Sequence, residues 1–247
     1  MDAILRRLLL LATLLFCTNA QAAITRVQAP AGVTNNSTTA SKSVTLTSTG
    51  AGEAIFVMVY KGDNTGNPTI SDNKSNAYVK DAQGTTTENV YIYSCLNPTN
   101  GVTSVTITVV TPHIFIAFVA TYTGLLSSGA FDKTSYHVTA SSTSYSSNAT
   151  ATLSQASELC LGLAATGQSS SDSIVANGSW TNPVAHTGNA GDGDDARWQE
   201  QIVNSTSGLA ATGTNASVTR LHAIIATYKA AGGVPCPQTR MLLGAGC

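Results

Sequence analysis

The sequence predicts an all-β protein, a two-sheet antiparallel β-sandwich of jelly-roll type with an internal duplication. Short runs rich in Val, Ile, Thr and Tyr alternate with loops of Gly, Asn, Ser, Asp and Pro. Short motifs recur in the same order about 106 residues apart, which is typical of a repeated unit. No stretch has the sustained i, i+3, i+4, i+7 apolar spacing of an amphipathic helix.

The first 22 residues have the pattern of a secretory signal peptide. Arg6 and Arg7 precede an apolar run from Leu8 to Cys17, and Ala20-Gln21-Ala22 supplies the small-x-small cleavage pattern. The apolar run is about half the length that a membrane-spanning helix needs. We therefore expect a secreted or cell-surface protein whose mature chain begins at Ala23 and has no transmembrane segment.

The expected strands differ in how they are covered. Segments 53–60 and 113–122 are apolar throughout, which indicates heavily covered strands, whereas 102–110 alternates branched apolar and hydroxyl residues like a half-buried strand. Segment 194–202 could compete as a helix, and we interpret it as a strand. The full set of expected strands is 42–48, 53–60, 88–95, 102–110, 113–122, 149–154, 158–165, 194–202 and 220–228.

Three matched motifs suggest the duplication. Glu53-Ala54-Ile55-Phe56 matches Glu158-Leu159-Cys160-Leu161, Asn97 with Gly101 matches Asn204 with Gly208, and Ala120-Thr121-Tyr122 recurs as Ala226-Thr227-Tyr228. The expected units run from about 42 to 124 and from 145 to 230, and residues 135–150 form the crossing between them. One unit alone would expose an apolar sheet face, so we expect a single sandwich domain over 23–230.

Several segments resemble a group of secreted bacterial and phage-associated β-sandwich proteins. Gly52 to Val57 is similar to their opening strand, and Asp72 to Tyr78 is similar to their Asp-x-x-Gly-Asn-x-Tyr hairpin, with Lys-Ser where the Gly would stand. Asn97 to Gly101 followed by Val105 to Thr108 resembles a third segment of these proteins. The resemblance covers roughly residues 42–230. It implies a jelly-roll-like extracellular sandwich, and it carries no catalytic residues.

Composition restricts the partners. Charged residues make up 10% of the 247 residues and the net charge is −1, whereas Thr (35), Ser (26) and Asn (16) are abundant. Binding to nucleic acid requires a basic surface, so we expect no nucleic-acid partner. The low charge is itself explained if Thr and Ser occupy the outward positions of strands.

Four cysteines follow the signal segment. Cys236 and Cys247 both lie in the tail, 231–247, and are expected to pair in a local loop. Cys95 and Cys160 lie in apolar strands, where they could form a disulfide across the core or remain buried thiols. The tail itself could cap an apolar edge, or could mediate self-association.

The clearest local motif is acidic. Asp192, Asp194 and Asp195 alternate with glycine in Gly-Asp-Gly-Asp-Asp, and carboxylates on a flexible loop are ligands that Ca²⁺ accepts. The motif does not have the spacing of an EF-hand. A calcium site is one hypothesis here, and an exposed loop that keeps a strand end polar is the other.

Aromatic residues suggest a second kind of site. Trp180, Trp198 and Tyr78 could offer flat faces for sugar stacking, although strands also use such rings for packing. The sequence lacks the serine-hydrolase elbow, the zinc-protease motif, the phosphate-binding loop and the dinucleotide fingerprint. We expect a non-catalytic module for surface attachment, recognition of a glycan or cell-surface polymer, or extracellular assembly. A polysaccharide-active hydrolase or lyase on a jelly-roll scaffold is the alternative.

Overall fold

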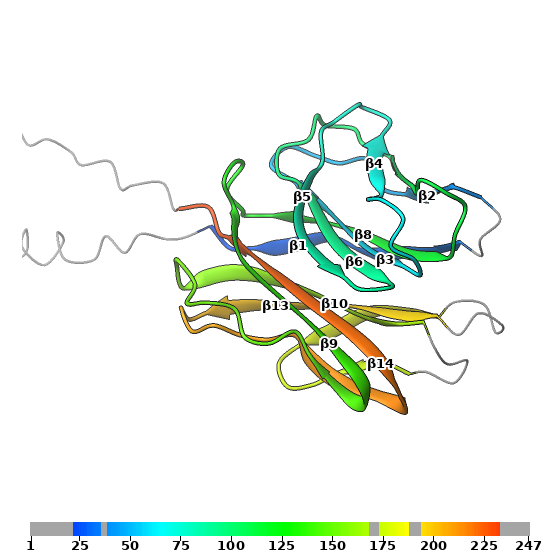
Figure 1. The fold of residues 1–247 in the computed structure, drawn as a ribbon. Helices are drawn as coiled ribbons and strands as arrows, with labels where there is room; N and C mark the ends of the chain where they lie inside the picture. The colour runs from blue at the N-terminus through cyan, green and yellow to red at the C-terminus, as the bar shows by residue number, and fades with distance from the viewer. Residues whose placement is uncertain (1–21, 36–38, 168–172, 188–193, 233–247) are drawn as a thin grey trace, which may run out of the picture.

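The computed structural model describes residues 22–35, 39–167, 173–187 and 194–232, which form fourteen antiparallel β-strands. The predicted all-β antiparallel sandwich is therefore confirmed (Figure 1). The strands are β1 (Thr25–Asn35), β2 (Ser41–Thr45), β3 (Ala54–Lys61), β4 (Thr69–Asp72), β5 (Val79–Thr85), β6 (Asn89–Cys95), β7 (Ser104–Thr108), β8 (Phe115–Thr123), β9 (Phe131–Ser146), β10 (Ser157–Thr166), β11 (Val175–Ala176), β12 (Thr181–Thr187), β13 (Asp195–Asn204) and β14 (Thr212–Lys229).

The strands form three layers rather than two. A central sheet of order β1-β8-β3-β6-β5 lies between a small sheet, β2-β7-β4, and an outer sheet of order β11-β14-β10-β13-β12, in which β9 also pairs with β14 (Figure 1). One apolar cluster joins the central and outer sheets, and a second joins the central and small sheets. The small sheet is an addition to the predicted two-sheet architecture.

The double covering explains why β3 is apolar along its whole length. All eight of its residues are buried. Phe56 and Met58 point into the cluster shared with the outer sheet, whereas Ile55 and Val57 point into the cluster shared with the small sheet. Because successive strand residues face opposite sides, a strand between two layers needs apolar residues at every position.

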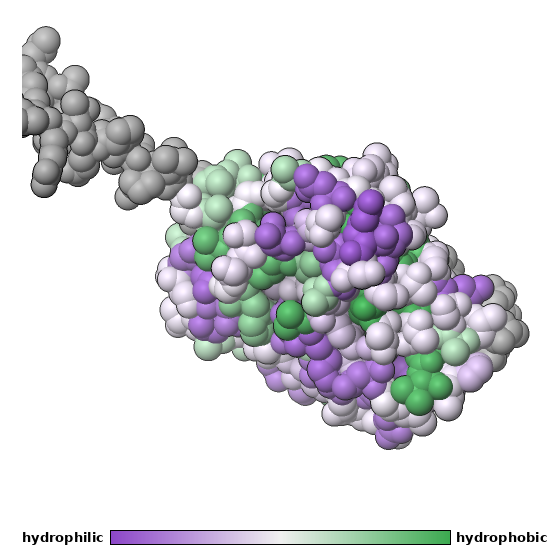
Figure 2. Space-filling model, turned by 90° about the horizontal axis from the view of Figure 1, so that it is seen from above, coloured by the Kyte–Doolittle hydropathy of each residue, from purple (hydrophilic) through white to green (hydrophobic). Residues whose placement is uncertain are grey.

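The low charge of the chain follows from the exposed strand positions, as the sequence predicts. In β7, Val105 and Ile107 are buried, whereas Ser104, Thr106 and Thr108 are partly exposed. The hydroxyls of Thr106 and Ser43 on β2 lie 2.8 Å apart on the exposed side of the small sheet. In the view from above, hydrophilic and near-neutral residues dominate, with hydrophobic ones in small separate groups (Figure 2).

The two large sheets share one strand order. If β9, β14, β10, β13 and β12 are matched to β1, β8, β3, β6 and β5, each strand has the corresponding neighbours. The register corresponds as well, because Ala54 pairs with Tyr122 as Leu159 pairs with Tyr228. This correspondence is what an internal duplication predicts, and it matches the repeated Ala-Thr-Tyr motif. The proposed bounds of the units stay a prediction.

Three sequence interpretations need correction. Residues 135–150, expected as a crossing connection, mostly belong to β9, which pairs along β14. Residues 149–154, expected as a strand, have no strand structure. Strands β1, β4, β5, β11 and β12 were not expected, and in β1 polar residues hide the pairing with β8. In the described part of the chain, no helix is long and apolar enough to cross a membrane.

Candidate functional site

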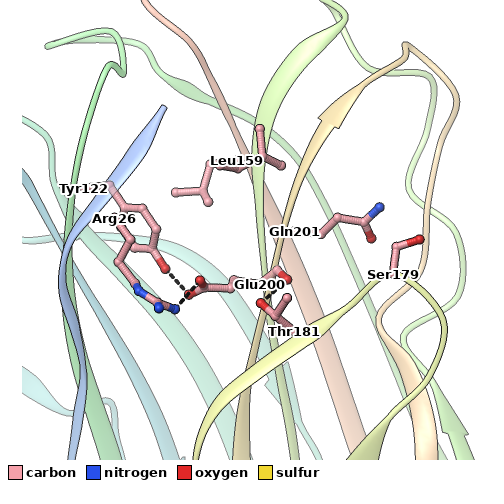
Figure 3. A pocket seen from close by; sticks show the side chains of 8 residues that line it. Arg26, Tyr122, Leu159, Ser179, Thr181, Glu200 and Gln201 are labelled. Atoms are coloured by element: carbon pink, nitrogen blue, oxygen red, sulfur yellow. Dashed lines mark hydrogen bonds and ion pairs between the residues drawn. The ribbon is translucent and has the colours of Figure 1, made fainter. Parts of the chain in front are cut away.

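A cavity of about 450 Å³ opens where one edge of the central sheet meets the outer sheet. Its volume falls in the range of small-molecule sites. Charged, amide and hydroxyl side chains dominate its lining (Figure 3). The residues that line it, here called the Glu200 pocket, are Arg26, Tyr122, Leu159, Ser179, Thr181, Glu200, Gln201 and Ile202.

Three donors hold the Glu200 carboxylate. Arg26 forms an ion pair with Oε1, and the Tyr122 hydroxyl donates to Oε2. The indole N–H of Trp198 donates to the same Oε2 at 3.0 Å. Burial and the neighbouring Glu200 carboxylate raise the pKa of Tyr122, so the phenol remains a donor at neutral pH. The carboxylate is thus fixed in orientation rather than free to turn.

Strand pairing brings these groups together. Arg26 on β1 lies opposite Tyr122 on β8, so the two side chains project from adjacent strands of the central sheet. Thr181 lies opposite Glu200 on the outer sheet, and its hydroxyl donates to the Glu200 carbonyl at 3.1 Å. In Figure 3, Glu200 reaches toward Arg26 and Tyr122, whereas Gln201 and Ser179 lie on the far side of its strand.

A second cavity, of about 570 Å³, occupies the equivalent place in the other half of the molecule. Its Phe131 pairs with Tyr228 as Arg26 pairs with Tyr122. Its Ser94 corresponds by register to Glu200. The equivalent positions therefore carry different chemistry, and only the Glu200 pocket has the guanidinium–carboxylate pair.

The predicted sugar-stacking residues do not form a common exposed surface. Trp198 has 0% of its surface exposed and belongs to the core between the two large sheets. Trp180 is 8% exposed, and its N–H donates to the Ala210 carbonyl at 3.0 Å. Trp198 reaches the Glu200 pocket through its N–H alone. In this conformation neither indole face is open for stacking.

Tyr78 has a local structural role. Its hydroxyl donates to Asp72 Oδ2 at 3.0 Å, and Asp72 also accepts the backbone N–H of Lys74 at 2.8 Å. These contacts close the turn after β4. Ser75, within this turn, has a φ of +58°, in the left-handed region that glycine adopts most easily.

The acidic motif does not form an exposed loop over its described part. Asp194 and Asp195 are 6% and 3% exposed. Asp194 accepts the Tyr60 hydroxyl at 3.2 Å, and Asp195 accepts the backbone N–H of Ile174 at 3.3 Å. Asp192 lies outside the described residues. Among the described residues, no group of three or more His, Cys, Asp or Glu side chains is placed to hold a metal ion, so the calcium site stays a prediction.

A buried polar cluster near Asp194 was not expected from the sequence. His222 has no exposed surface, and its Nε2 lies 3.0 Å from Glu88 Oε2. The Tyr136 hydroxyl lies 3.1 Å from His222 Nδ1. Burial and the carboxylates of Asp194 and Glu88 raise the pKa of Tyr60. The cluster fills the interface between the central and outer sheets, at the opposite end from the Glu200 pocket.

Cys95 and Cys160 are free thiols, so a disulfide between them is excluded in this structure. Cys95 points into the cluster beneath the small sheet, whereas Cys160 packs with Trp180 on the far face of the outer sheet. The core between the two large sheets separates them. The buried-thiol alternative is the correct one. Cys236 and Cys247 lie outside the described residues, as does the rest of the tail.

Sequence reasoning missed Arg26 and did not single out Glu200. The repeated Ala-Thr-Tyr motif did mark Tyr122, and the inward-facing strand positions of 194–202 could have pointed to Glu200. Arg26 lies in a strand that was not expected, so nothing in the sequence placed it opposite Tyr122.

Comparison of the chain with protein-family models, with curated proteins and with solved structures finds no match.

Proposed function

We propose that the chain is a secreted, non-catalytic β-sandwich module that recognises a glycan through the Glu200 pocket. The observation that carries this proposal is the fixed Arg26–Glu200 pair beside the exposed hydroxyl of Thr181 in a cavity of ligand size. The signal-like N-terminal segment supports the extracellular setting. Attachment to a cell-surface polymer is the role that such a module would serve.

The available groups suit a ligand rich in hydroxyls. The guanidinium of Arg26 has five N–H donors and its side chain is 36% exposed, so the pair with Glu200 leaves donors for a ligand. The exposed Thr181 adds a hydroxyl beside Glu200, whereas Gln201 and Ser179 line the pocket on the far side of the Glu200 strand. Because Arg26 and Glu200 neutralise each other, the pocket has no net charge to attract an ionic ligand.

The same geometry favours recognition over hydrolysis. Glycosidases commonly use two carboxyl groups roughly 5–9.5 Å apart, one as acid and one as base or nucleophile. Glu200 is the single carboxylate among the described residues that line the pocket. Its oxygens already accept bonds from Arg26, Tyr122 and Trp198, so the carboxylate is committed to contacts within the protein.

A glycan array probed with the wild-type chain and with Arg26→Ala tests the proposal. We expect selective binding, and about tenfold weaker binding by the variant, since charge-assisted hydrogen bonds contribute roughly 1.5–3 kcal/mol. Lys74→Ala, an exposed cation away from the pocket, is the matched control and should bind as the wild type does. Absence of glycan binding, or equal binding by Arg26→Ala, would contradict the proposal. New reducing ends that disappear in Glu200→Gln would instead favour the hydrolase.

A further inference from the structure

A third cavity, of about 320 Å³, lies at the other end of the central sheet, between the loop after β3 and the β5–β6 hairpin. None of the described residues that line it carries a charge. Its side chains are almost all amides and hydroxyls. We call this cavity the amide pocket, and the polar residues that line it are Asn64, Asn67, Gln83, Thr85, Thr86, Asn89 and Tyr91.

One buried acceptor in the amide pocket lacks a donor. Asn89 is 2% exposed, and its Oδ1 receives no hydrogen bond from the described residues. A buried polar atom without a partner costs about 1–3 kcal/mol, and most buried polar atoms in native proteins bond to protein or to ordered water. Oδ1 is covered in this structure but Asn89 lines the pocket, so a ligand hydroxyl would supply the missing donor once the carboxamide turns toward the cavity.

The loop that carries Asn64 and Asn67 is held in place by a buried cation. Lys61 is fully buried, and its Nζ donates to the Thr65 carbonyl at 2.7 Å and forms an ion pair with Asp63. The Tyr91 hydroxyl donates to the Gly66 carbonyl at 3.3 Å from the other side. The loop is therefore braced by contacts that do not use its Asn67 amide, which remains exposed at the mouth of the pocket.

The two polar pockets are far apart. The Glu200 pocket lies at the level of Ala54, and the amide pocket lies near Lys61, seven residues further along β3. At about 3.3 Å per strand residue, the separation along the strand is roughly 23 Å. One small ligand cannot occupy both, so the amide pocket is a distinct site.

We infer that the amide pocket is a second binding site that takes a neutral sugar unit. Carboxamides supply both donors and acceptors, which matches the adjacent hydroxyls of a pyranose. Gln83 keeps its N–H donors, since Lys80 Nζ donates to its Oε1, and no charged residue is among the described ones that line the pocket. The exposed amides of Asn67 and Gln83 bind the sugar at the mouth, and a turn of the Asn89 carboxamide lets its Oδ1 accept one sugar hydroxyl. The inference does not depend on the function proposed for the Glu200 pocket.

Saturation-transfer NMR with glucose, galactose, mannose and N-acetylglucosamine tests this inference on the full chain. We expect at least one sugar to bind, and Asn67→Ala/Gln83→Ala to raise its Kd about tenfold through the loss of two hydrogen bonds. Both residues are exposed, so their removal spares the core on which folding depends. Asn204→Ala, an exposed amide on β13 that lines none of the three cavities, is the matched control and should leave the Kd unchanged.

Arg26→Ala distinguishes the two sites in the same experiment. A sugar signal that survives Arg26→Ala but falls in Asn67→Ala/Gln83→Ala supports the amide pocket. A signal that depends on Arg26 alone overturns the second site and leaves the Glu200 pocket standing. If none of the four sugars gives a signal that depends on Asn67 and Gln83, the inference is wrong.

Discussion

The hydroxyl of Tyr228 donates a hydrogen bond to Asp81 Oδ2 at 2.8 Å, and so joins the last strand of the outer sheet to the edge strand of the central sheet. Tyr122, which holds the equivalent register position in the central sheet, donates in the opposite direction to Glu200 of the outer sheet. In each large sheet, the tyrosine of the Ala-Thr-Tyr motif therefore donates to a carboxylate of the other sheet. The Glu200 pocket and the second cavity lie beside these two contacts.

Replacement of Tyr228 by Phe should destabilise the chain by about 1–3 kcal/mol, because Asp81 loses a donor while its carboxyl stays largely buried. Burial already raises the pKa of Asp81, and the bond from Tyr228 opposes that rise. Urea unfolding measures the loss. Tyr91→Phe, whose hydroxyl meets a neutral carbonyl at 3.3 Å, should cost less. Equal losses of unfolding free energy in the two variants would mean that the bond to the Asp81 carboxylate stabilises the chain no more than a bond to a neutral carbonyl.

Ser75→Gly should stabilise the turn after β4 by about 1 kcal/mol, because a side chain at φ +58° carries a steric cost that glycine avoids. Thermal unfolding should register the gain as a rise in Tm of a few degrees. Ser71→Gly, on strand β4, supplies the contrast and should lower the Tm. A fall in Tm for Ser75→Gly would show that its side chain contributes more than its backbone conformation costs.

Cys95 and Cys160 should resist thiol reagents in the native chain and react only after denaturation. Burial raises the pKa of Cys95 to about 11 and that of Cys160 still further, so neither thiol ionises near neutral pH. Labelling with iodoacetamide, with and without denaturant, followed by mass spectrometry, measures both sites. A peptide that links Cys95 to Cys160 in a non-reducing digest would contradict the arrangement of the sheets.

Much of the fold could be predicted because strand patterns report how each face is covered. The apolar run 53–60 and the alternating run 102–110 became β3 and β7, and the repeated motifs marked Tyr122 and Tyr228 as equivalent. The small sheet could not be predicted. An apolar strand sequence indicates that the strand is buried, but it does not say which sheet covers it.

The candidate site could not be predicted, because its polar residues differ between equivalent positions of the two large sheets. Glu200 corresponds by register to Ser94, and the carboxylate that meets Tyr228 lies instead on the neighbouring strand, as Asp81. Arg26 corresponds in the same way to Phe131. Sequence periodicity finds equivalent positions, but it does not say which of them has exchanged a polar residue for an apolar one.

Glu158 should make the stability of the chain depend on pH near neutrality. Its side chain is buried at the start of β10, and burial raises the pKa of its carboxyl from 4.5 to about 7. Asp132 lies beside it, and bonds from Ser154 and Lys133 keep the pKa of Asp132 low. The charge on Asp132 therefore adds to the cost of ionising Glu158.

The direction of the pH dependence follows from the raised pKa. The folded state holds the Glu158 proton more tightly than the unfolded state, so its contribution to stability is complete below pH 4.5 and is lost as the pH rises toward about 7. The loss should be on the order of 2 kcal/mol, with allowance for solvent screening. Glu158→Gln removes the ionisation and should flatten the curve across this range, with a gain in stability above pH 7.

Guanidinium unfolding at a series of pH values between 4.5 and 8 measures the curve. Glu53→Gln is the matched control, because Glu53 holds the equivalent place before β3 and the variant leaves Glu158 intact. That control should keep the wild-type slope. Glu158→Gln could instead keep the wild-type dependence of unfolding free energy on pH. In that case the proton bound near neutral pH belongs to another group, and the charge on Asp132 does not oppose ionisation of Glu158.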